Sequence, residues 1–306
     1  MPNGLRAAVL VLFLFAGIGA SAAAAADTAP LPVLPMSQAI HDMLPPEIKA
    51  AGRITLATDA HYPTCESFAA DGKTIVGFEP DLWNAMAQVL GIEIVPSSIE
   101  FASVIPGISG GRYDVAMGCI SDRPAREKQV TFVDFSYSTG SAVYYMQADK
   151  SITNGDLLSL CGKKTAVQVG NVIATAVELL NDYCVAHGKP KTVMGEVPQA
   201  SAVVLGVFAG RYDFALSDAV AFDELQKTAP QPLATFYFPL RPKAYIGMIV
   251  KPERTALTNA LLAAVEKVDE SGTYDKIWDN WKIAHAKLQK PGINLATTRD
   301  VKTAKE

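Results

Sequence analysis

Residues 111–128 read GRYDVAMGCISDRPAREK, and this stretch decides the fold. Its apolar run is typical of a buried strand, yet it opens at once into small and hydroxyl residues and then two arginines. The word GRYD returns at 210–213, where the next apolar strand runs into SDAVAFD. Both copies follow a helix that begins with alanine and serine. The repeat predicts two similar lobes, although a helix, turn and strand recur in any α/β protein.

Strand and helix patterns alternate around both copies, which predicts an α/β fold with largely parallel sheets. Strands are expected at 53–59, 92–97, 113–118, 163–170, 192–195, 212–217 and 245–250, and helices at 79–91, 103–111, 173–188, 200–210, 254–272 and 273–288. The last strand and the last two helices are expected to return to the first lobe. The chain would then cross between the lobes twice, near residues 140–146 and 238–245, and two crossings make a hinge.

The N-terminus reads as a leader. Arg6 precedes an uncharged run, AAVLVLFLFAGIGA, and small residues then lead to Asp27, which predicts a cleaved secretory signal peptide. No cysteine lies near the cleavage region, so we expect no lipid anchor and a periplasmic protein. The predicted division of the chain is a signal peptide at 1–26, an N-terminal extension at 27–50, a first lobe at 51–143 plus 244–287, a second lobe at 144–243 and a C-terminal tail at 288–306. The extension and the tail are expected to be loosely ordered.

Composition excludes several classes of function. The formal net charge of −4 disfavours nucleic acid as a partner, because nucleic acid binding needs a clustered basic surface. Four scattered histidines show no metal-ligand spacing. Neither a phosphate-binding P-loop nor a nucleophile elbow is present. We therefore expect no metal and no cofactor.

Four cysteines are an even number in an oxidising compartment. Cys161 precedes a predicted strand and Cys184 ends the helical pattern that follows, so a bridge between them would close one strand–helix unit and contribute about 3 kcal/mol. Cys65 and Cys119 both follow strands and would pair if their loops are neighbours. The alternative for this second pair is two ordinary buried thiols.

The candidate site lies where the two repeated strands end, because open α/β sheets bind ligands beyond the carboxyl ends of their strands. The first loop offers the guanidinium of Arg126 and the hydroxyl of Ser121, which suit a carboxylate. The second loop offers Asp218, which suits an ammonium group. Opposite charges on the two walls of one cleft predict a zwitterionic ligand, and the smallest common one is an α-amino acid. The alternatives are a surface arginine paired with Glu127 and a helix N-cap at Asp218.

Two aromatic residues add to this site. Tyr62 and Phe101 follow strands that a parallel sheet would place beside the Arg126 loop, where they would enclose the ligand's side chain. The alternative is a plain rim or core position. Arg123 is interpreted as a solvated neighbour and not as a ligand-binding residue.

These residues resemble a known family, the bacterial extracellular solute-binding proteins of family 3, of the polar amino acid type, which are periplasmic components of ABC importers. The resemblance covers about residues 50–285 and lies in the following motifs: ATDAHYPTCES, VGFEPDLWNAMAQVLG, FASVIPGISGGRYDVAMGCISDRPAREKQVTFVDFSY, CGKKTAVQVGN, GRYDFALSDAV and SGTYDKIWDNW. It implies the two-lobed periplasmic-binding-protein fold, often called a Venus flytrap.

The resemblance also implies roles for individual residues. Arg126 would clamp the ligand carboxylate with Ser121 and with the backbone amides of Gly118 and Cys119, and Asp218 would take the ammonium group. Asp59 would lie near the far end of the ligand's side chain. The second-lobe loop reads GNV at 170–172 in place of a frequent threonine, so only the amide of Val172 would reach the carboxylate. This departure, with those at Cys65, His61 and Gly118, leaves the ligand's identity open.

The resemblance implies a function of binding and delivery. A monomer would bind an amino acid or a related small zwitterion and deliver it to an ABC-type permease in the inner membrane, without enzymatic activity. One alternative is a periplasmic enzyme similar to cyclohexadienyl dehydratase, for which Glu66 and Glu79 are the nearest acid or base candidates. The other is a ligand sensor that acts in trans on a receptor.

Overall fold

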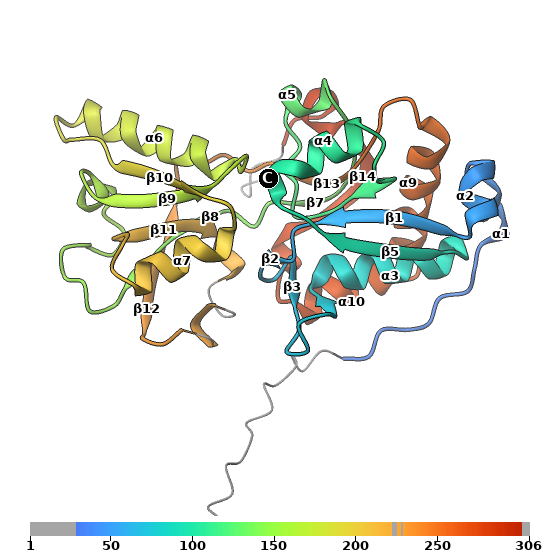
Figure 1. Cartoon of the computed structure of the whole chain (residues 1–306), viewed down its shortest axis with the longest axis horizontal. Helices are drawn as coiled ribbons and strands as arrows, with labels where there is room; N and C mark the ends of the chain where they lie inside the picture. Colours follow the sequence, from blue (N-terminus) through green and yellow to red (C-terminus); the bar gives the residue numbers. More distant parts are fainter. Residues whose placement is uncertain (1–28, 222–224, 228, 302–306) are drawn as a thin grey trace, which may run out of the picture.

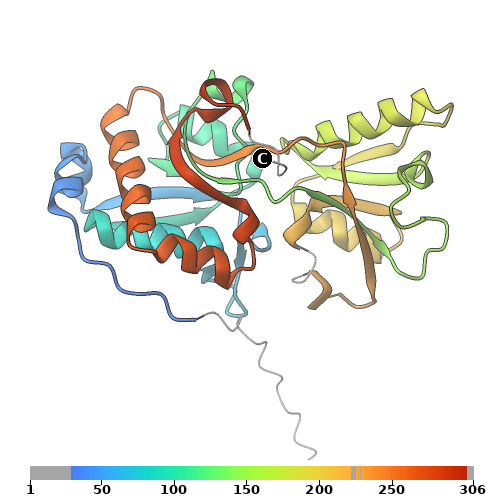
Figure 2. The same cartoon turned by 180° about the vertical axis from the view of Figure 1, so that it is seen from behind.

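The computed structural model describes residues 29–221, 225–227 and 229–301, which form two lobes joined by two crossing segments (Figures 1 and 2). The predicted signal peptide lies outside the described residues. Among the helices of these residues, none is both long enough and apolar enough to span a membrane.

The first lobe is built on a six-stranded sheet in the order β14-β7-β13-β6-β1-β5. Its elements are α1 (Gln38–Asp42), α2 (Pro46–Ala51), β1 (Arg53–Thr58), α3 (Phe78–Leu90), β5 (Glu93–Ser98), η1 (Phe101–Ser103), α4 (Val104–Ser109), β6 (Val115–Ala116), α5 (Pro124–Glu127), β7 (Thr131–Tyr137), β13 (Tyr245–Val250), α9 (Thr255–Glu270), α10 (Thr273–Asn280), η4 (Ala284–Ala286), β14 (Lys287–Ile293) and α11 (Leu295–Thr298). A small separate sheet joins β2 (His61–Tyr62), β3 (Glu66–Phe68) and β4 (Ile75–Val76).

The second lobe contains the remaining strands in two groups. Its elements are β8 (Ser141–Met146), η2 (Leu157–Leu160), β9 (Lys164–Gln168), α6 (Ile173–Ala186), β10 (Val193–Val197), α7 (Ala200–Phe208), β11 (Phe214–Asp218), η3 (Ala219–Ala221) and β12 (Leu233–Phe238). Strands β10 and β9 pair with each other, and β11, β8 and β12 pair in that order. Helices α6 and α7 cover opposite faces (Figure 1). Strand β8 accordingly has alternate residues in two apolar clusters, Val143 and Tyr145 with α6, and Ala142 and Tyr144 with α7.

The two GRYD motifs perform the same structural task in the two lobes. The Asp114 carboxylate accepts the backbone N–H of Thr55 in β1 at 2.8 Å, and the Asp213 carboxylate accepts that of Lys164 in β9 at 2.7 Å. Each aspartate therefore fixes the start of its strand against another strand, β1 in the first lobe and β9 in the second. The predicted repeat is confirmed by these matching bonds.

Glycines allow the tight turn in each motif. Gly111 and Gly210 have φ values of 72° and 67°, a left-handed conformation that residues with a Cβ adopt at a cost. A third glycine, Gly206 in α7, lies under the Tyr212 ring, and a Cβ there would lie 2.3 Å from a ring carbon. The spacing of helix, turn and strand thus depends on residues that have no side chain.

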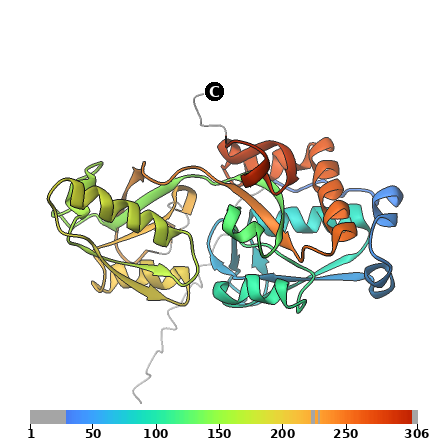
Figure 3. The same cartoon turned by 90° about the horizontal axis from the view of Figure 1, so that it is seen from above.

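Two adjacent segments connect the lobes. The first runs from the end of β7 to the start of β8, and the second from the end of β12 to the start of β13. Seen from above, they pass side by side between the lobes (Figure 3). The exact lobe boundaries predicted from the sequence stay a prediction.

The sheets are mixed, whereas the sequence predicted mostly parallel ones. Strand β1 pairs parallel with β5 and β6, and β9 pairs parallel with β10, because a helix crosses over between them. The strand that enters each lobe after a crossing segment, β13 in the first lobe and β8 in the second, runs antiparallel to its neighbours. Thus β13 and β14 pair antiparallel with β7, and β11 and β12 pair antiparallel with β8.

The prediction that both ends are loosely ordered is wrong for the described residues. Ile40, Leu44 and Ile48 in the N-terminal extension are buried in the main core of the first lobe. Residues 287–293 form β14 at the edge of the six-stranded sheet, and Leu295 after it is buried. In the N-terminal extension, the spacing of these apolar residues by four was the sequence signal for their packing in the core.

Both predicted disulfides are present, Cys65–Cys119 in the first lobe and Cys161–Cys184 in the second. The second closes the strand–helix unit of β9 and α6, as the sequence predicted. The first joins the loop before β3 to the loop after β6, and both of these loops reach the region between the lobes.

Three carboxyl groups hold the segment after β14 to the first lobe. Asp134 accepts from the Leu295 N–H at 2.9 Å, Asp122 from the Ala296 N–H at 3.0 Å, and Glu127 from the Thr297 hydroxyl. Burial, with the nearby charge of Asp122, raises the pKa of Asp134 to about 9. Asp134 therefore stays protonated at neutral pH and donates to Asp122.

Replacing Asp134 by asparagine is expected to stabilise the protein at high pH. A carboxyl whose pKa is raised by folding contributes stability below its ordinary pKa of about 4, and this contribution is lost as the pH rises toward 9. Asparagine keeps the donor and the acceptor without titrating. In thermal melts at pH 4, 6 and 8, we expect the advantage of Asp134→Asn over wild type to grow with pH, by about 2–4 °C per kcal/mol.

Asp114→Asn is the matched control with the opposite sign. Burial opposes ionisation of Asp114, but bonds from Thr55 and Arg254 prevail and lower its pKa. Its contribution to stability is therefore nearly constant between pH 4 and 8 and is lost only below about pH 4, so Asp114→Asn should melt below wild type by a similar amount at all three pH values. If the difference in melting temperature between Asp134→Asn and wild type does not change from pH 4 to pH 8, the raised pKa of Asp134 is contradicted.

Candidate functional site

The candidate site is a cavity between the lobes with a volume of about 360 Å3, including space open to solvent. It is lined by Asp59, Tyr62, Glu66, Phe101, Gly118, Cys119, Ser121, Arg126, Gln168, Asn171, Val172, Asp218 and Arg241. All nine residues predicted from the sequence are in this lining. The structure therefore brings them together, and their roles in binding stay a prediction.

Local structure explains the convergence. Asp59 follows β1, and Ser121 lies in the loop after β6, while Gln168 and Asp218 end β9 and β11 in the other lobe. The ends of these strands all point toward the gap between the lobes (Figure 1). Val172 lies at the N-terminus of α6, a helix of 14 residues whose dipole favours negative charge there.

Arg126 is a half-buried cation without a carboxylate partner among the described residues. Its guanidinium donates to the Ser121 carbonyl at 2.9 Å and, across the gap, to the Gly170 carbonyl at 3.0 Å. It also lies 5.7 Å from the centre of the Phe101 ring, which gives a cation–π contact. Burial and the nearby charges of Arg123 and Arg241 lower the pKa of Arg126 to about 10, so it stays charged at neutral pH. The alternative pairing with Glu127 is not observed.

Asp218 is the buried anion of the opposite lobe. One carboxylate oxygen accepts from the Tyr62 hydroxyl at 2.8 Å, and the other accepts from Arg241 at 3.1 Å. Burial, followed by the charge of Asp218, raises the pKa of Tyr62, so the phenol stays neutral and donates. The sequence reasoning missed Arg241, whose only signal was its place in the predicted second crossing.

A second set of hydrogen-bonded polar side chains lies at the other end of the cavity. The Gln168 amide donates across the gap to Asp59 at 2.6 Å, and His61 contacts the other oxygen of Asp59 at 2.7 Å. Asn171 in turn donates to the Gln168 side chain at 3.2 Å. Gln168 and Asn171 were also missed, because uncharged amides inside a VQVGN motif carry no distinctive pattern.

Two buried glutamates lie behind this end of the cavity. Glu66 lines the cavity and is hydrogen-bonded to Glu79, and both are almost fully buried. Burial, then the charges of Glu79 and Asp59, raises the pKa of Glu66 well above its ordinary value, and burial raises that of Glu79 to about 7. Glu66 therefore holds a proton that it donates to Glu79.

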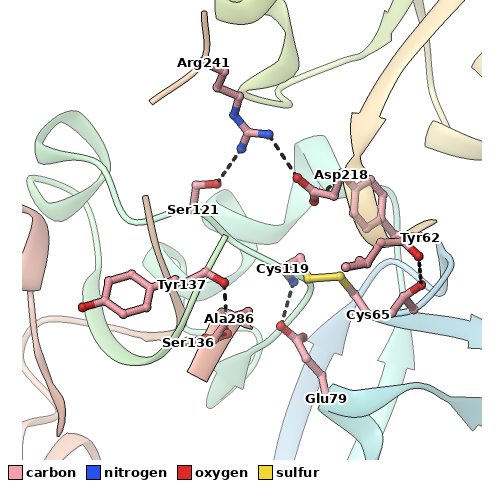
Figure 4. The surroundings of a disulfide bond; sticks show 12 residues. Tyr62, Cys65, Glu79, Cys119, Ser121, Ser136, Tyr137, Asp218, Arg241 and Ala286 are labelled. Carbon is pink, nitrogen blue, oxygen red and sulfur yellow. Dashed lines mark hydrogen bonds and ion pairs between the residues drawn. A yellow bond between two sulfur atoms is a disulfide. The ribbon is translucent and has the colours of Figure 1, made fainter. Parts of the chain in front are cut away.

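The loop of Gly118 and Cys119 is tied to the same pair, as Figure 4 shows for Cys119. The Cys119 amide donates to Glu79 at 2.9 Å, and the Gly118 amide also bonds to Glu79. The family resemblance implied that these amides face the ligand; in this structure both bond to Glu79, and their role in binding stays a prediction. The disulfide from Cys119 to Cys65 holds the loop from the other side.

The cavity is closed by direct contacts between the lobes. Besides the bonds described above, the Thr64 hydroxyl donates to the Val220 carbonyl at 3.4 Å. Each charged side chain in the lining thus has a protein partner. These contacts hold the two lobes together around the cavity.

Glu66→Gln is expected to reduce the loss of stability with rising pH. A carboxyl group whose pKa is raised by folding contributes stability below its ordinary pKa of about 4.5. The contribution of the Glu66–Glu79 pair is lost as the pH rises through the raised pKa values, of which that of Glu79 is about 7. Glutamine preserves the donor to Glu79 without titrating, so the thermal midpoint at pH 8 should exceed that of wild type by a few degrees. Glu66→Ala removes the donor and should lower the midpoint at pH 5. Equal pH profiles for wild type and Glu66→Gln would refute the shared proton.

Comparisons with known proteins agree on one group of relatives. The sequence model of the bacterial extracellular solute-binding proteins, family 3, matches residues 54–284. The putative ABC transporter arginine-binding protein 2 of Escherichia coli (strain K12) is 33% identical over 236 residues, 76% of this chain and 91% of that protein. ABC transporter arginine-binding protein 1 of the same organism is 31% identical over 235 residues, with the same two coverages.

A solved structure shares the architecture. An ancestral arginine-binding protein bound to arginine is 26% identical, has a TM-score of 0.64, and covers 75% of this chain and 98% of its own. This similarity confirms the two-lobed α/β fold predicted from the sequence.

Proposed function

The chain belongs to the bacterial extracellular solute-binding proteins, family 3, and from this we propose that it binds an amino acid between its lobes and delivers it to an ABC-type permease. The proposal includes an exported monomer in the periplasm whose signal peptide is removed. It also includes the absence of catalysis, as in the binding proteins to which it is similar.

One observation carries the proposal, namely that opposite charges from opposite lobes line one cavity. Arg126 of the first lobe lacks a carboxylate partner among the described residues, and its planar guanidinium suits a ligand carboxylate. Asp218 of the second lobe suits an ammonium group. A zwitterion satisfies both walls at once only when the lobes are close together, so its binding favours the closed form.

The other end of the cavity supports a cationic side chain. Asp59 and Glu66 are both buried there, and Phe101 and Tyr62 line the path from the Arg126 end. A guanidinium or ammonium group beside these acids would compensate a charge that is costly to bury alone. Relatives named for arginine support the same class of ligand, and L-arginine is the first candidate.

Hinge closure is the proposed mechanism of delivery. The lobes separate about the two crossing segments, the ligand binds, and the closed form docks on the permease. The ligand shifts this equilibrium only by its greater affinity for the closed form.

Arg126→Ala is expected to weaken binding of L-arginine at least a hundredfold, because two charge-assisted bonds worth about 1.5–3 kcal/mol each are lost. The measurement is isothermal titration calorimetry, after a thermal-shift screen of the twenty amino acids has confirmed the best ligand. Arg123→Ala is the matched control, since Arg123 is a neighbouring half-buried arginine outside the cavity lining. Unchanged affinity in Arg126→Ala would refute the site.

A second candidate function, a dehydratase of a cyclic carboxylate, is favoured by the burial of Glu66. An acid that keeps its proton beside a ligand cavity is a group that such a reaction needs. The expected result under the binding proposal is no turnover. The test is incubation with prephenate, followed by chromatography for an aromatic product, with Glu66→Gln as the control. Product formation that this substitution abolishes would replace the binding proposal with an enzymatic one.

A further inference from the structure

Arg241 occupies the centre of the contact between the lobes. It lies in the second crossing segment, between β12 and β13, and only 7% of its surface is exposed. Its guanidinium donates to the Asp218 carboxylate at 3.1 Å, to the Ser141 hydroxyl at 2.8 Å and to the Ser121 hydroxyl at 3.3 Å. Figure 4 shows the side chain reaching between Ser121 and Asp218.

The acceptors of Arg241 come from three separate parts of the molecule. Asp218 ends a strand of the second lobe, Ser121 belongs to a loop of the first lobe, and Ser141 begins β8 after the first crossing. A single side chain therefore ties both lobes and both crossing segments together. Separation of the lobes must break at least the bond to Ser121 or the bond to Asp218.

Two of these acceptors are also the groups proposed to receive the ligand. Asp218 is the acceptor for the ligand's ammonium group, and the Ser121 hydroxyl lies at the carboxylate end beside Arg126. Tyr62 donates to the second oxygen of Asp218, so both oxygens are already in use. A protein cation thus stands where a ligand cation would be expected.

Repulsion between like charges explains why Asp218 does not favourably bind Arg241 and a ligand ammonium group at the same time. With Arg241 in place, the charge of Asp218 is already compensated within a largely buried ion pair. An ammonium group that bound Asp218 as well would lie beside a guanidinium of the same sign, where little water screens the repulsion. Displacement of Arg241 removes this repulsion, and it also frees the bridge between the lobes.

We propose that Arg241 is a specificity-determining residue that substitutes for the ligand's ammonium group. In the ligand-free protein it occupies Asp218 and holds the lobes together, and it leaves Asp218 when an α-amino acid binds. The energetic advantage that an amino acid gains from its ammonium group is therefore reduced by the loss of the Arg241 bonds. This inference rests on the proposed function, because it takes the ligand to be an amino acid.

The first arm of the test needs no ligand. Small-angle X-ray scattering compares the radius of gyration of ligand-free wild type, Arg241→Met and Arg254→Met. Methionine keeps an unbranched apolar chain without charge or donors, and Arg254 pairs with Asp114 and Glu47 in the first lobe, away from the cavity. We expect a larger radius for Arg241→Met alone. A radius equal to that of wild type would overturn the bridging role.

The second arm measures what the ammonium group contributes. Calorimetry gives the affinities for L-arginine and for 5-guanidinopentanoate, which is the same molecule without its α-ammonium group. We expect the ratio of the two affinities to rise at least about tenfold in Arg241→Met, because Asp218 is then free for the ligand. An unchanged ratio with both affinities lowered would show that Arg241 instead supports the carboxylate, and would overturn the proposal.

Further variants keep the outcomes distinct. Arg241→Lys keeps the positive charge, so it should retain the wild-type radius of gyration and the wild-type ratio of the two affinities. If circular dichroism shows that Arg241→Met does not fold, Arg241→Gln takes its place. Failure of every variant and of wild type to bind L-arginine would count against the proposed ligand. The scattering arm would still decide whether Arg241 holds the lobes together.

Discussion

The structure depends on a separation of charge between its two lobes. Arg126 is half-buried on one wall of the cavity with only carbonyl oxygens as acceptors, and Asp218 is buried on the other wall. A buried charge is costly unless it is paired, so each wall favours a partner of opposite sign. A small zwitterion provides both partners when the lobes are closed. The same requirement explains why Arg241 pairs with Asp218 in this structure.

The rest of each lobe serves to hold these groups in place. The GRYD aspartates fix the strands whose ends carry the cavity loops, and left-handed glycines make the turns before them. In the first lobe, the Cys65–Cys119 disulfide and Glu79 hold the loop after β6 from two sides. The loop is therefore preformed, which lowers the entropy that a ligand must overcome on binding.

Buried acids are the unusual feature of this first lobe. The pair of Glu66 and Glu79 and the pair of Asp122 and Asp134 each share a proton, because burial disfavours two adjacent negative charges. One pair lies behind the cavity and the other holds the chain after β14. Stability of the first lobe and the shape of its ligand loop are thus both linked to protonation.

The sequence by itself determined the class of fold, both disulfides and nine residues of the cavity lining. The fold and five of these residues follow from local signals: a repeated motif, the alternation of strands and helices, and charged, hydroxyl or aromatic residues after strands. The other four, Asp59, Gly118, Cys119 and Val172, followed only from the family resemblance, and the Cys65–Cys119 disulfide was predicted only on the condition that the two loops are neighbours. Only the tertiary structure decided the remaining features. Glu66 holds a proton because it is buried beside Glu79, and the Cys119 amide donates to that same Glu79. Arg241 entered the site from a crossing segment with no repeating pattern, because its partners are distant in sequence and meet only when the lobes close.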